Sequence, residues 1–349
     1  MVGVDEQTKG GMWTVAENYL NDREFIRQTD LEYVATSITG SIPKRLVFTA
    51  KALLKIFAKL VGGKFDIVHV HMAERGSVYR KNIVITLAKM FGCKVVIHMH
   101  GAEFETWYRA MTADKQQGVR KILDKADKIL ILGEYWMEFV SSLVAHKERV
   151  CVLHNAVSVP EENGYDIQAT ELMFLGVVGQ RKGIFDLLQA IKLADDRLLG
   201  EVRLKIYGPQ KDTDIEAEIR KLAISHRASY EGWLTADKKP EVFGKTALNI
   251  LPSYNEGLPM TILETMAYGI PNISTNVAAI PEAVDDTNGA IINPGDAQHL
   301  AEVIVQMMND KTLREEKSRK TYEKAKTAFA IDVHVNKVLD IYRELEQKK

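Results

Sequence analysis

Short apolar runs alternate with longer amphipathic segments along almost the whole chain. The runs in the first half have the length and composition of strands, and they cover residues 31–37, 65–72, 93–100, 128–132 and 149–154. Segments with helical periodicity lie between them, at residues 11–20, 44–60, 80–90, 115–126 and 134–146. The second half repeats the scheme, with strand-like runs at residues 171–178, 202–208, 247–253, 271–275 and 289–293. Because Val/Ile/Leu-rich runs that alternate with helices form parallel sheets covered on both faces, the pattern predicts an α/β protein with two doubly wound domains.

The periodic pattern lapses over residues 154–170, where Pro, Asn and Gly collect, and this lapse predicts a domain boundary. We predict an N-terminal Rossmann-like domain over residues 1–156 and a C-terminal one over residues 157–330. We expect the last helix, within residues 331–349, to return to the N-terminal domain. Only four residues, MVGV, precede the first loop, so we expect the first strand to be truncated and the chain to begin inside a longer gene product.

Composition excludes several classes of protein. With 46% hydrophobic and 27% charged residues, the chain is neither disordered nor collagen-like. No apolar run approaches the roughly 20 residues of a membrane-spanning helix. A net charge of −1 and the lack of a known nucleic-acid module argue against a nucleic-acid partner. The two cysteines, Cys93 and Cys151, make no disulfide framework, which favours a reducing, cytoplasmic location.

Residues 251–271, LPSYNEGLPMTILETMAYGIP, hold two glutamates on either side of a turn and a helix start. Pro259 suits the first helical position, and Gly269 with Pro271 suits the end, so we predict a helix over residues 259–268. The loop before it follows a parallel strand, where open α/β sheets bind ligands. Glu256 lies in that loop and Glu264 in the second helical turn.

This arrangement suits a sugar phosphate. The backbone N–H groups of Leu258, Met260 and Thr261 at a helix N-terminus favour a phosphate group. Carboxylates on either side accept hydrogen bonds from sugar hydroxyls. The alternative is an acidic loop followed by a glutamate that complements the helix dipole.

The glutamate motif resembles the signature of the retaining family-4 glycosyltransferases, which have the GT-B fold. Four further segments resemble parts of the same family: a double-glycine loop, a His–Gly loop, a loop with a basic pair and a late strand-to-helix turn. They lie at residues 9–19, 96–105, 174–191 and 288–304. The resemblance implies an α/β GT-B fold of two Rossmann-like domains with a cleft between them.

The resemblance also implies roles for individual residues. The catalytic set would be Glu256 at the transferred sugar, Lys182 and Arg181 at the donor diphosphate, and His100 facing the reaction centre. Val177 is a departure, because many relatives have an arginine there. Glu264 would bind the ribose, and the other donor-binding residues would be Gly257, Leu258, Pro259, Met260, Thr261, Gly208, Trp233, Leu234, Gly10 and Gly11. The acceptor side would include Phe104, Trp107 and Tyr108.

From the resemblance we expect transfer of a hexose or N-acetylhexosamine, with retention, from a nucleotide-diphosphate sugar to a sugar hydroxyl. UDP-sugars are favoured over GDP-sugars, and the acceptor would be a lipid-linked polysaccharide or oligosaccharide precursor. No cofactor and no metal are expected. Two alternatives stay open: a nucleotide-sugar epimerase of the same fold, which would need no acceptor, and a non-catalytic nucleotide-sugar-binding protein.

Two His-x-His pairs suggest a different chemistry. His69 with His71, and His98 with His100, would each face one side of a predicted strand, and neighbouring strands would bring all four together. Four imidazoles so placed could bind zinc. Because no accompanying carboxylates are evident and the resemblance implies a metal-free reaction, we favour structural histidines with one functional member, His100.

A basic segment lies between Glu32 and Asp66, where there is no acidic residue. Its cations are Lys44, Arg45, Lys51, Lys55, Lys59 and Lys64. A basic amphipathic helix can rest on an anionic membrane, with about 1 kcal/mol from each near-surface cation. The alternative is a packed helix with one solvated face. Together with the resemblance, the segment predicts a cytoplasmic protein that contacts the inner face of the cell membrane.

Overall fold

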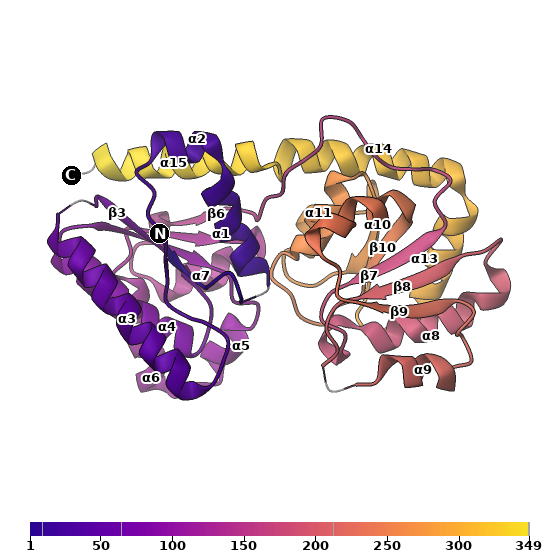
Figure 1. Ribbon diagram of the computed structural model, residues 1–349, viewed down its shortest axis with the longest axis horizontal. Helices are drawn as coiled ribbons and strands as arrows, with labels where there is room; N and C mark the ends of the chain where they lie inside the picture. Colours follow the sequence, from indigo (N-terminus) through magenta and orange to yellow (C-terminus); the bar gives the residue numbers. More distant parts are fainter. Residues whose placement is uncertain (9, 64, 212, 348–349) are drawn as a thin grey trace. The chain divides into compact units, whose positions relative to one another are not determined.

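The computed structural model describes residues 1–8, 10–63, 65–211 and 213–347, so Lys9 and Lys64 lie outside the described residues. The chain divides into two compact units. Unit 1 consists of Met1–Ala156 and Ile331–Lys349, and unit 2 of Val157–Ala330. Each unit holds one parallel sheet with helices packed around it (Figure 1). The predicted α/β class with two doubly wound domains is therefore confirmed.

The sheet of unit 1 has the strand order β2-β1-β3-β4-β5-β6, and all its pairings are parallel. The strands are β1 Val2–Gly3, β2 Val34–Ala35, β3 Ile67–Met72, β4 Lys94–Met99, β5 Lys128–Ile131 and β6 Val150–Val152. From β1 the chain adds β2 on one side and then β3 to β6 on the other. The point where the order reverses, between β1 and β3, is where such sheets bind ligands.

Helices lie around this sheet, and the C-terminal helix of the chain is one of them. They are α1 Gly11–Asn21, α2 Arg23–Gln28, α3 Ile42–Val61, α4 Gly76–Met90, α5 Phe104–Arg109, α6 Ala113–Leu123, α7 Met137–Leu143 and α15 Ile331–Gln347, with 3-10 turns at Glu134–Trp136 and Lys147–Arg149. Helix α15 lies alongside α2 (Figure 1), and Arg343 of α15 donates to the Gln28 side chain at 2.5 Å. The C-terminal helix thus belongs to unit 1.

The sheet of unit 2 has the order β12-β11-β10-β7-β8-β9 and is also entirely parallel. The strands are β7 Glu171–Leu175, β8 Arg203–Tyr207, β9 Ala228–Gly232, β10 Thr246–Leu251, β11 Asn272–Thr275 and β12 Gly289–Ile292. The chain starts in the middle with β7, runs outward to β9 and returns to β10 on the other side. The reversal point therefore lies between β7 and β10.

The helices of unit 2 include one whose start differs from the prediction. They are α8 Ile184–Ala194, α9 Ile215–Lys221, α10 Lys239–Lys245, α11 Met260–Ala267, α12 Ile280–Ala283, α13 Ala297–Asn309 and α14 Lys311–Ala328, with 3-10 turns at Gln180–Lys182, Asp195–Arg197 and Ala236–Lys238. Pro259 is the residue before α11 and has an extended backbone, with ψ 126°. The predicted first helical position was therefore wrong by one residue.

Burial explains why the apolar runs became central strands. Val95, Val96 and Ile97 of β4 are all fully buried, although consecutive residues face opposite sides of the sheet. A strand that is covered on both faces must be apolar throughout, as the runs predicted. Among the described residues, no helix is both long enough and apolar enough to span a membrane.

Candidate active site

Two loops meet at the reversal point of unit 2. The 3-10 turn Gln180–Lys182 follows β7, and residues 252–259 follow β10, the neighbouring parallel strand. Gly183 makes their close approach possible: its φ is +71°, and a Cβ there would lie 1.9 Å from the carbonyl oxygen of Pro252. Two hydrogen bonds join the loops, because Tyr254 N donates to the Arg181 carbonyl oxygen at 2.9 Å and Arg181 Nη1 donates to the Asn255 carbonyl oxygen at 2.8 Å.

A buried carboxylate and two cations gather where these loops touch. Glu256 is 6% exposed and accepts a hydrogen bond from Ser253 Oγ at 2.8 Å. The Lys182 ammonium forms an ion pair with the same carboxylate, and Arg181 Nη1 lies 4.0 Å from its second oxygen. The Lys182 side chain is 13% exposed and that of Arg181 44%. The structure thus brings three predicted catalytic residues together, with one positive charge in excess that suits an anionic ligand.

Glu264 lies apart from this group, in α11. Its carboxylate is half-buried and pairs with Lys239 Nζ at 2.7 Å. The backbone between the two glutamates is tightly packed, with Leu258, Pro259 and Met260 buried and Gly257 and Thr261 half-buried. An α-helix of 8 residues begins directly after the loop, at Met260.

The strand ends of β8 and β9 place the remaining predicted donor residues of unit 2. Gly208 has φ +128°, and a Cβ there would lie 1.8 Å from the Gly176 carbonyl oxygen, so a close approach of two backbones requires glycine. Trp233 is 48% exposed, whereas Leu234 is buried in a core cluster with Leu175, Tyr207 and Phe243 among others. Val177, the departure from the pattern of the resembled family, is exposed.

In unit 1 the two glycines follow β1, at the reversal point. Gly10 precedes α1 with φ +153° and Gly11 is the first residue of that helix. Both are exposed, and among the described residues, apart from its chain neighbours, no atom lies within 4 Å of the position of a Cβ on Gly10. A backbone without side chains at the N-terminus of an 11-residue helix suits close contact with an anionic or hydroxylated ligand.

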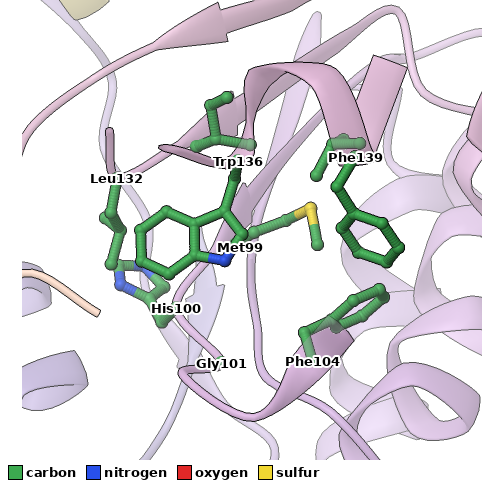
Figure 2. A pocket seen from close by; sticks show the side chains of 9 residues that line it. Met99, His100, Gly101, Phe104, Leu132, Trp136 and Phe139 are labelled. Atoms are coloured by element: carbon green, nitrogen blue, oxygen red, sulfur yellow. The ribbon is translucent and has the colours of Figure 1, made fainter. Parts of the chain in front are cut away.

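His100 follows β4 and borders a small apolar pocket. Figure 2 shows its ring with Met99, Phe104, Leu132, Trp136 and Phe139 around the same space. Of the three residues predicted for the acceptor side, Phe104 lines this pocket and is buried. Tyr108 is also buried, and its hydroxyl accepts from Arg120 Nε at 2.8 Å. Trp107 is half-buried, so it is the one of the three with an accessible ring.

The four histidines of the His-x-His pairs do meet, because β3 and β4 are neighbours and His71 is directly opposite His98. His71 Nδ1 is 2.8 Å from His100 Nε2. Burial lowers the pKa of His69, His71 and His98 well below the ordinary value, and lowers the pKa of His100 to about 3. All four are therefore neutral imidazoles near pH 7, and His100 can offer a hydrogen bond but no charge.

Helix α3 carries three stripes with different character. Its buried stripe is narrow and consists of Ala52, Ile56 and Leu60. At 3.6 residues per turn, the next stripe round the axis is apolar but exposed by 45–70%, and it contains Leu46, Val47, Leu54, Phe57 and Val61. The third stripe is basic, with Lys44, Lys51 and Lys55 exposed. Lys59, at its edge, is half-buried and pairs with Glu32, and Arg45 is exposed near the helix start.

Two family models match the chain, one to each unit. Residues 15–156 match the "Glycosyl transferase 4-like domain" and residues 160–327 match "Glycosyl transferases group 1". An uncharacterised 41.2 kDa protein in the cps region of Klebsiella pneumoniae is 25% identical over 98% of this chain and 99% of its own length. The Escherichia coli UDP-Gal:alpha-D-GlcNAc-diphosphoundecaprenol alpha-1,3-galactosyltransferase is 23% identical over 87% of this chain and 82% of its own.

A solved structure shares the fold over almost the entire chain. The Anabaena protein Alr3699/HepE in complex with UDP superposes with a TM-score of 0.76 and 13% identity, covering 98% of this chain and 99% of that one. Two Rossmann-like units and matching family models for both confirm the predicted GT-B architecture. The chain therefore belongs to the GT-B glycosyltransferases of the family-4 type.

Proposed function

We propose that this glycosyltransferase moves a hexose or N-acetylhexosamine from a nucleotide-diphosphate sugar, with a UDP-sugar favoured, to a hydroxyl of a lipid-linked polysaccharide precursor. The reaction would retain the anomeric configuration and need no metal. The observation that carries the proposal is the group of Lys182, Arg181 and Glu256 at the reversal point of unit 2. Support for the substrates comes from the E. coli relative, whose name gives a UDP-sugar donor and a diphosphoundecaprenol-linked acceptor, and from HepE, which binds UDP.

In this proposal the same group of side chains would bind both the diphosphate and the sugar of the donor. Lys182 and Glu256 satisfy each other without ligand, with Ser253 as a second partner of the carboxylate. A diphosphate, which carries more negative charge than one carboxylate, would draw Lys182 and Arg181 towards its oxygens. The released Glu256 oxygen would then accept a hydrogen bond from a hydroxyl of the transferred sugar, while Ser253 keeps the carboxylate in place.

The chemical step then needs charge stabilisation more than a nucleophile. The bond between the anomeric carbon and the diphosphate oxygen breaks, and the acceptor oxygen forms the new bond on the same face. The acceptor proton passes to an oxygen of the leaving diphosphate. Lys182 and Arg181 would stabilise the negative charge that develops there, as preorganised cations do in other transferases. Glu264 would bind the ribose, and Gly10, Gly11 and His100 of unit 1 would contact the acceptor or the sugar.

We test this with thermal stabilisation by UDP, GDP, ADP and their sugar conjugates, each with and without EDTA. A nucleotide at 100 times its dissociation constant adds about 2.7 kcal/mol to the free energy of unfolding. We expect UDP to stabilise and EDTA to leave both the shift and the transfer rate unchanged. The Lys182→Ala variant should lose the shift, whereas Lys192→Ala, an exposed lysine of α8, should keep it. NMR of the product gives its anomeric configuration and so tests whether transfer proceeds with retention.

Three outcomes would contradict the proposal. Consumption of the nucleotide-sugar without any acceptor would favour the epimerase. Binding without turnover for any acceptor would favour the non-catalytic protein. Loss of transfer in EDTA that added metal restores would remove the metal-independent mechanism.

We also propose that α3 rests on the anionic inner face of the cell membrane. Its exposed apolar stripe lies beside the basic stripe, so the apolar side chains can enter the interface while Lys44, Lys51 and Lys55 meet lipid phosphates. Phe91, at the end of α4, extends the exposed apolar area, since its ring lies 5.9 Å from that of Phe57. A lipid-linked acceptor would make such a position useful.

The membrane proposal predicts co-sedimentation with vesicles that contain phosphatidylglycerol and much weaker binding to phosphatidylcholine alone. The double variant Lys51→Glu/Lys55→Glu removes two cations worth about 1 kcal/mol each, so we expect binding to fall at least about 30-fold. Leu54→Ser/Phe57→Ser should weaken binding to both kinds of vesicle. Lys115→Glu, an exposed lysine of α6, is the control. Equal binding of all four proteins would show that α3 is only a solvated helix.

A further inference from the structure

Three buried imidazoles converge on the face of the unit 1 sheet that carries α1 and α15. His69 and His71 alternate along β3, and His98 of β4 lies opposite His71. Their potential ligand nitrogens all lie within 4.8 Å of one another, and the three residues are 1%, 0% and 0% exposed. The rings of His69 and His71 are nearly parallel, at 12°, with centroids 5.0 Å apart.

Four ring nitrogens of this group have no hydrogen-bond partners among the described residues. They are His69 Nε2, His71 Nε2 and both ring nitrogens of His98. A buried polar group without a partner costs about 1–3 kcal/mol, and four in one place are unusual for a folded protein. An ion or a water molecule at this place would satisfy them.

The outer nitrogens of two of these rings are, by contrast, well bonded. His69 Nδ1 is 2.6 Å from the Tyr342 hydroxyl of α15, and His71 Nδ1 is 2.8 Å from His100 Nε2. When each Nδ1 carries the proton and donates it outward, each Nε2 keeps its lone pair directed at the centre of the group. Metal-binding histidines have this arrangement, in which an outer partner holds the ring and the tautomer.

We propose that His69, His71 and His98 bind one divalent transition metal ion, with zinc as the ion that three neutral imidazoles suit best. Three histidines are a known zinc ligand set, with a fourth position left for water. Zinc–nitrogen distances of about 2.0–2.1 Å would bring the three nitrogens, which lie within 4.8 Å of one another, together around the ion. The ion would join β3 to β4 and, through Tyr342, hold α15 on the sheet.

The metal itself would take no part in the proposed transfer reaction. Its ligands lie in unit 1, whereas Lys182, Arg181 and Glu256, which would carry the donor chemistry, lie in unit 2. The metal would stabilise unit 1, and the leaving diphosphate would not need it. Metal analysis and nucleotide binding therefore test the two proposals separately, and a negative result in one does not decide the other.

The test uses the full chain, with zinc as the probe. We expect close to one zinc per chain by mass spectrometry after desalting, and a lower melting temperature after treatment with a strong chelator, restored by zinc. Cobalt(II) in its place should give the intense visible absorption of a tetrahedral site. His98→Ala should lose the metal, and His146→Ala, an exposed histidine of the same unit, should keep it.

Tyr342→Phe keeps all three ligands and removes only the oxygen beside His69, so it serves even where His98→Ala does not fold. Loss of an outer partner lowers metal affinity about 10–100-fold, and we expect a decrease in that range by competition with a chromogenic chelator. A UDP-induced shift in each variant would show that unit 2 is folded. The proposal is overturned where the wild type binds no stoichiometric zinc, or where His98→Ala or Tyr342→Phe binds it as tightly as the wild type.

Discussion

The substitution Glu256→Gln tests the two roles that we propose for Glu256, in the ion pair with Lys182 and in binding the transferred sugar. In the wild type the carboxylate competes with a diphosphate for Lys182, and it must afterwards hold a sugar hydroxyl. Glutamine keeps the shape and the oxygen that accepts from Ser253, but it removes the charge. We therefore expect the variant to bind free UDP more tightly and to transfer sugar more slowly.

The magnitude follows from the contacts. Lys182 keeps its charge and a hydrogen bond in the variant, so what is lost is the ion-pair attraction to the carboxylate, which for this largely buried pair we take as roughly 1–1.5 kcal/mol. Since 1.4 kcal/mol is a factor of ten, the dissociation constant for UDP should fall about 5–10-fold. The loss of the same charge beside a sugar hydroxyl should lower kcat at least about 5-fold.

Calorimetric titration with UDP and initial rates at saturating donor measure the two effects separately. Glu302→Gln, an exposed glutamate of α13, is the matched control and should change neither. Weaker UDP binding by Glu256→Gln would refute the reasoning, because it would mean that the carboxylate orients Lys182 for the diphosphate instead of competing with it.

Two further predictions concern stability. Gly183→Ala places a Cβ against the Pro252 carbonyl at φ +71°, whereas Gly200→Ala has a similar φ of +75° and open space around the Cβ. Both variants should lose about 1–2 kcal/mol of stability because of the left-handed backbone, and we expect a clearly larger loss for Gly183→Ala in urea unfolding. Equal losses would contradict the close approach of the two loops. Burial lowers the pKa of His334 from its ordinary 6.5 to about 4, so between these values the unfolded chain binds a proton that the folded chain does not. Between pH 6.5 and about 4, His334 should then contribute a loss of stability of about 1.4 kcal/mol per pH unit. His334→Gln should show a pH dependence smaller by one proton, and an unchanged dependence would mean that His334 is charged in the folded protein.

The central strands could be predicted from the sequence because their environment determines their composition. Strands covered on both faces must be apolar, and each predicted run from residue 65 onward contains a strand. Strand β9, Ala228–Gly232, was missed because Ser229 and Glu231 are not buried and no apolar run forms. The start of α11 was misplaced because proline suits both the first helical position and the extended residue before it.

The members of the donor group could be predicted individually, but the contact between them could not. Lys182 and Glu256 are 74 residues apart and meet because β7 and β10 are neighbours. Strand order is a property of the whole sheet, which no local pattern encodes. The motif also gave no sign that Glu256 would pair with Lys182 in the absence of a ligand, because a resemblance reports which groups a site holds and not how they satisfy each other.

His100 shows how the histidine cluster bears on catalysis. Its Nε2 lies 2.8 Å from His71 Nδ1, and in the arrangement where His71 donates, His100 must carry its own proton on Nδ1. Burial keeps the pKa of this ring at about 3, so at neutral pH it offers one N–H donor and no positive charge. A neutral donor is suited to a sugar hydroxyl and unsuited to a leaving diphosphate. The positive charge that the reaction needs must then come from Lys182 and Arg181, and the loss of either cation cannot be compensated by acidifying the solution to pH 5, where His100 remains neutral.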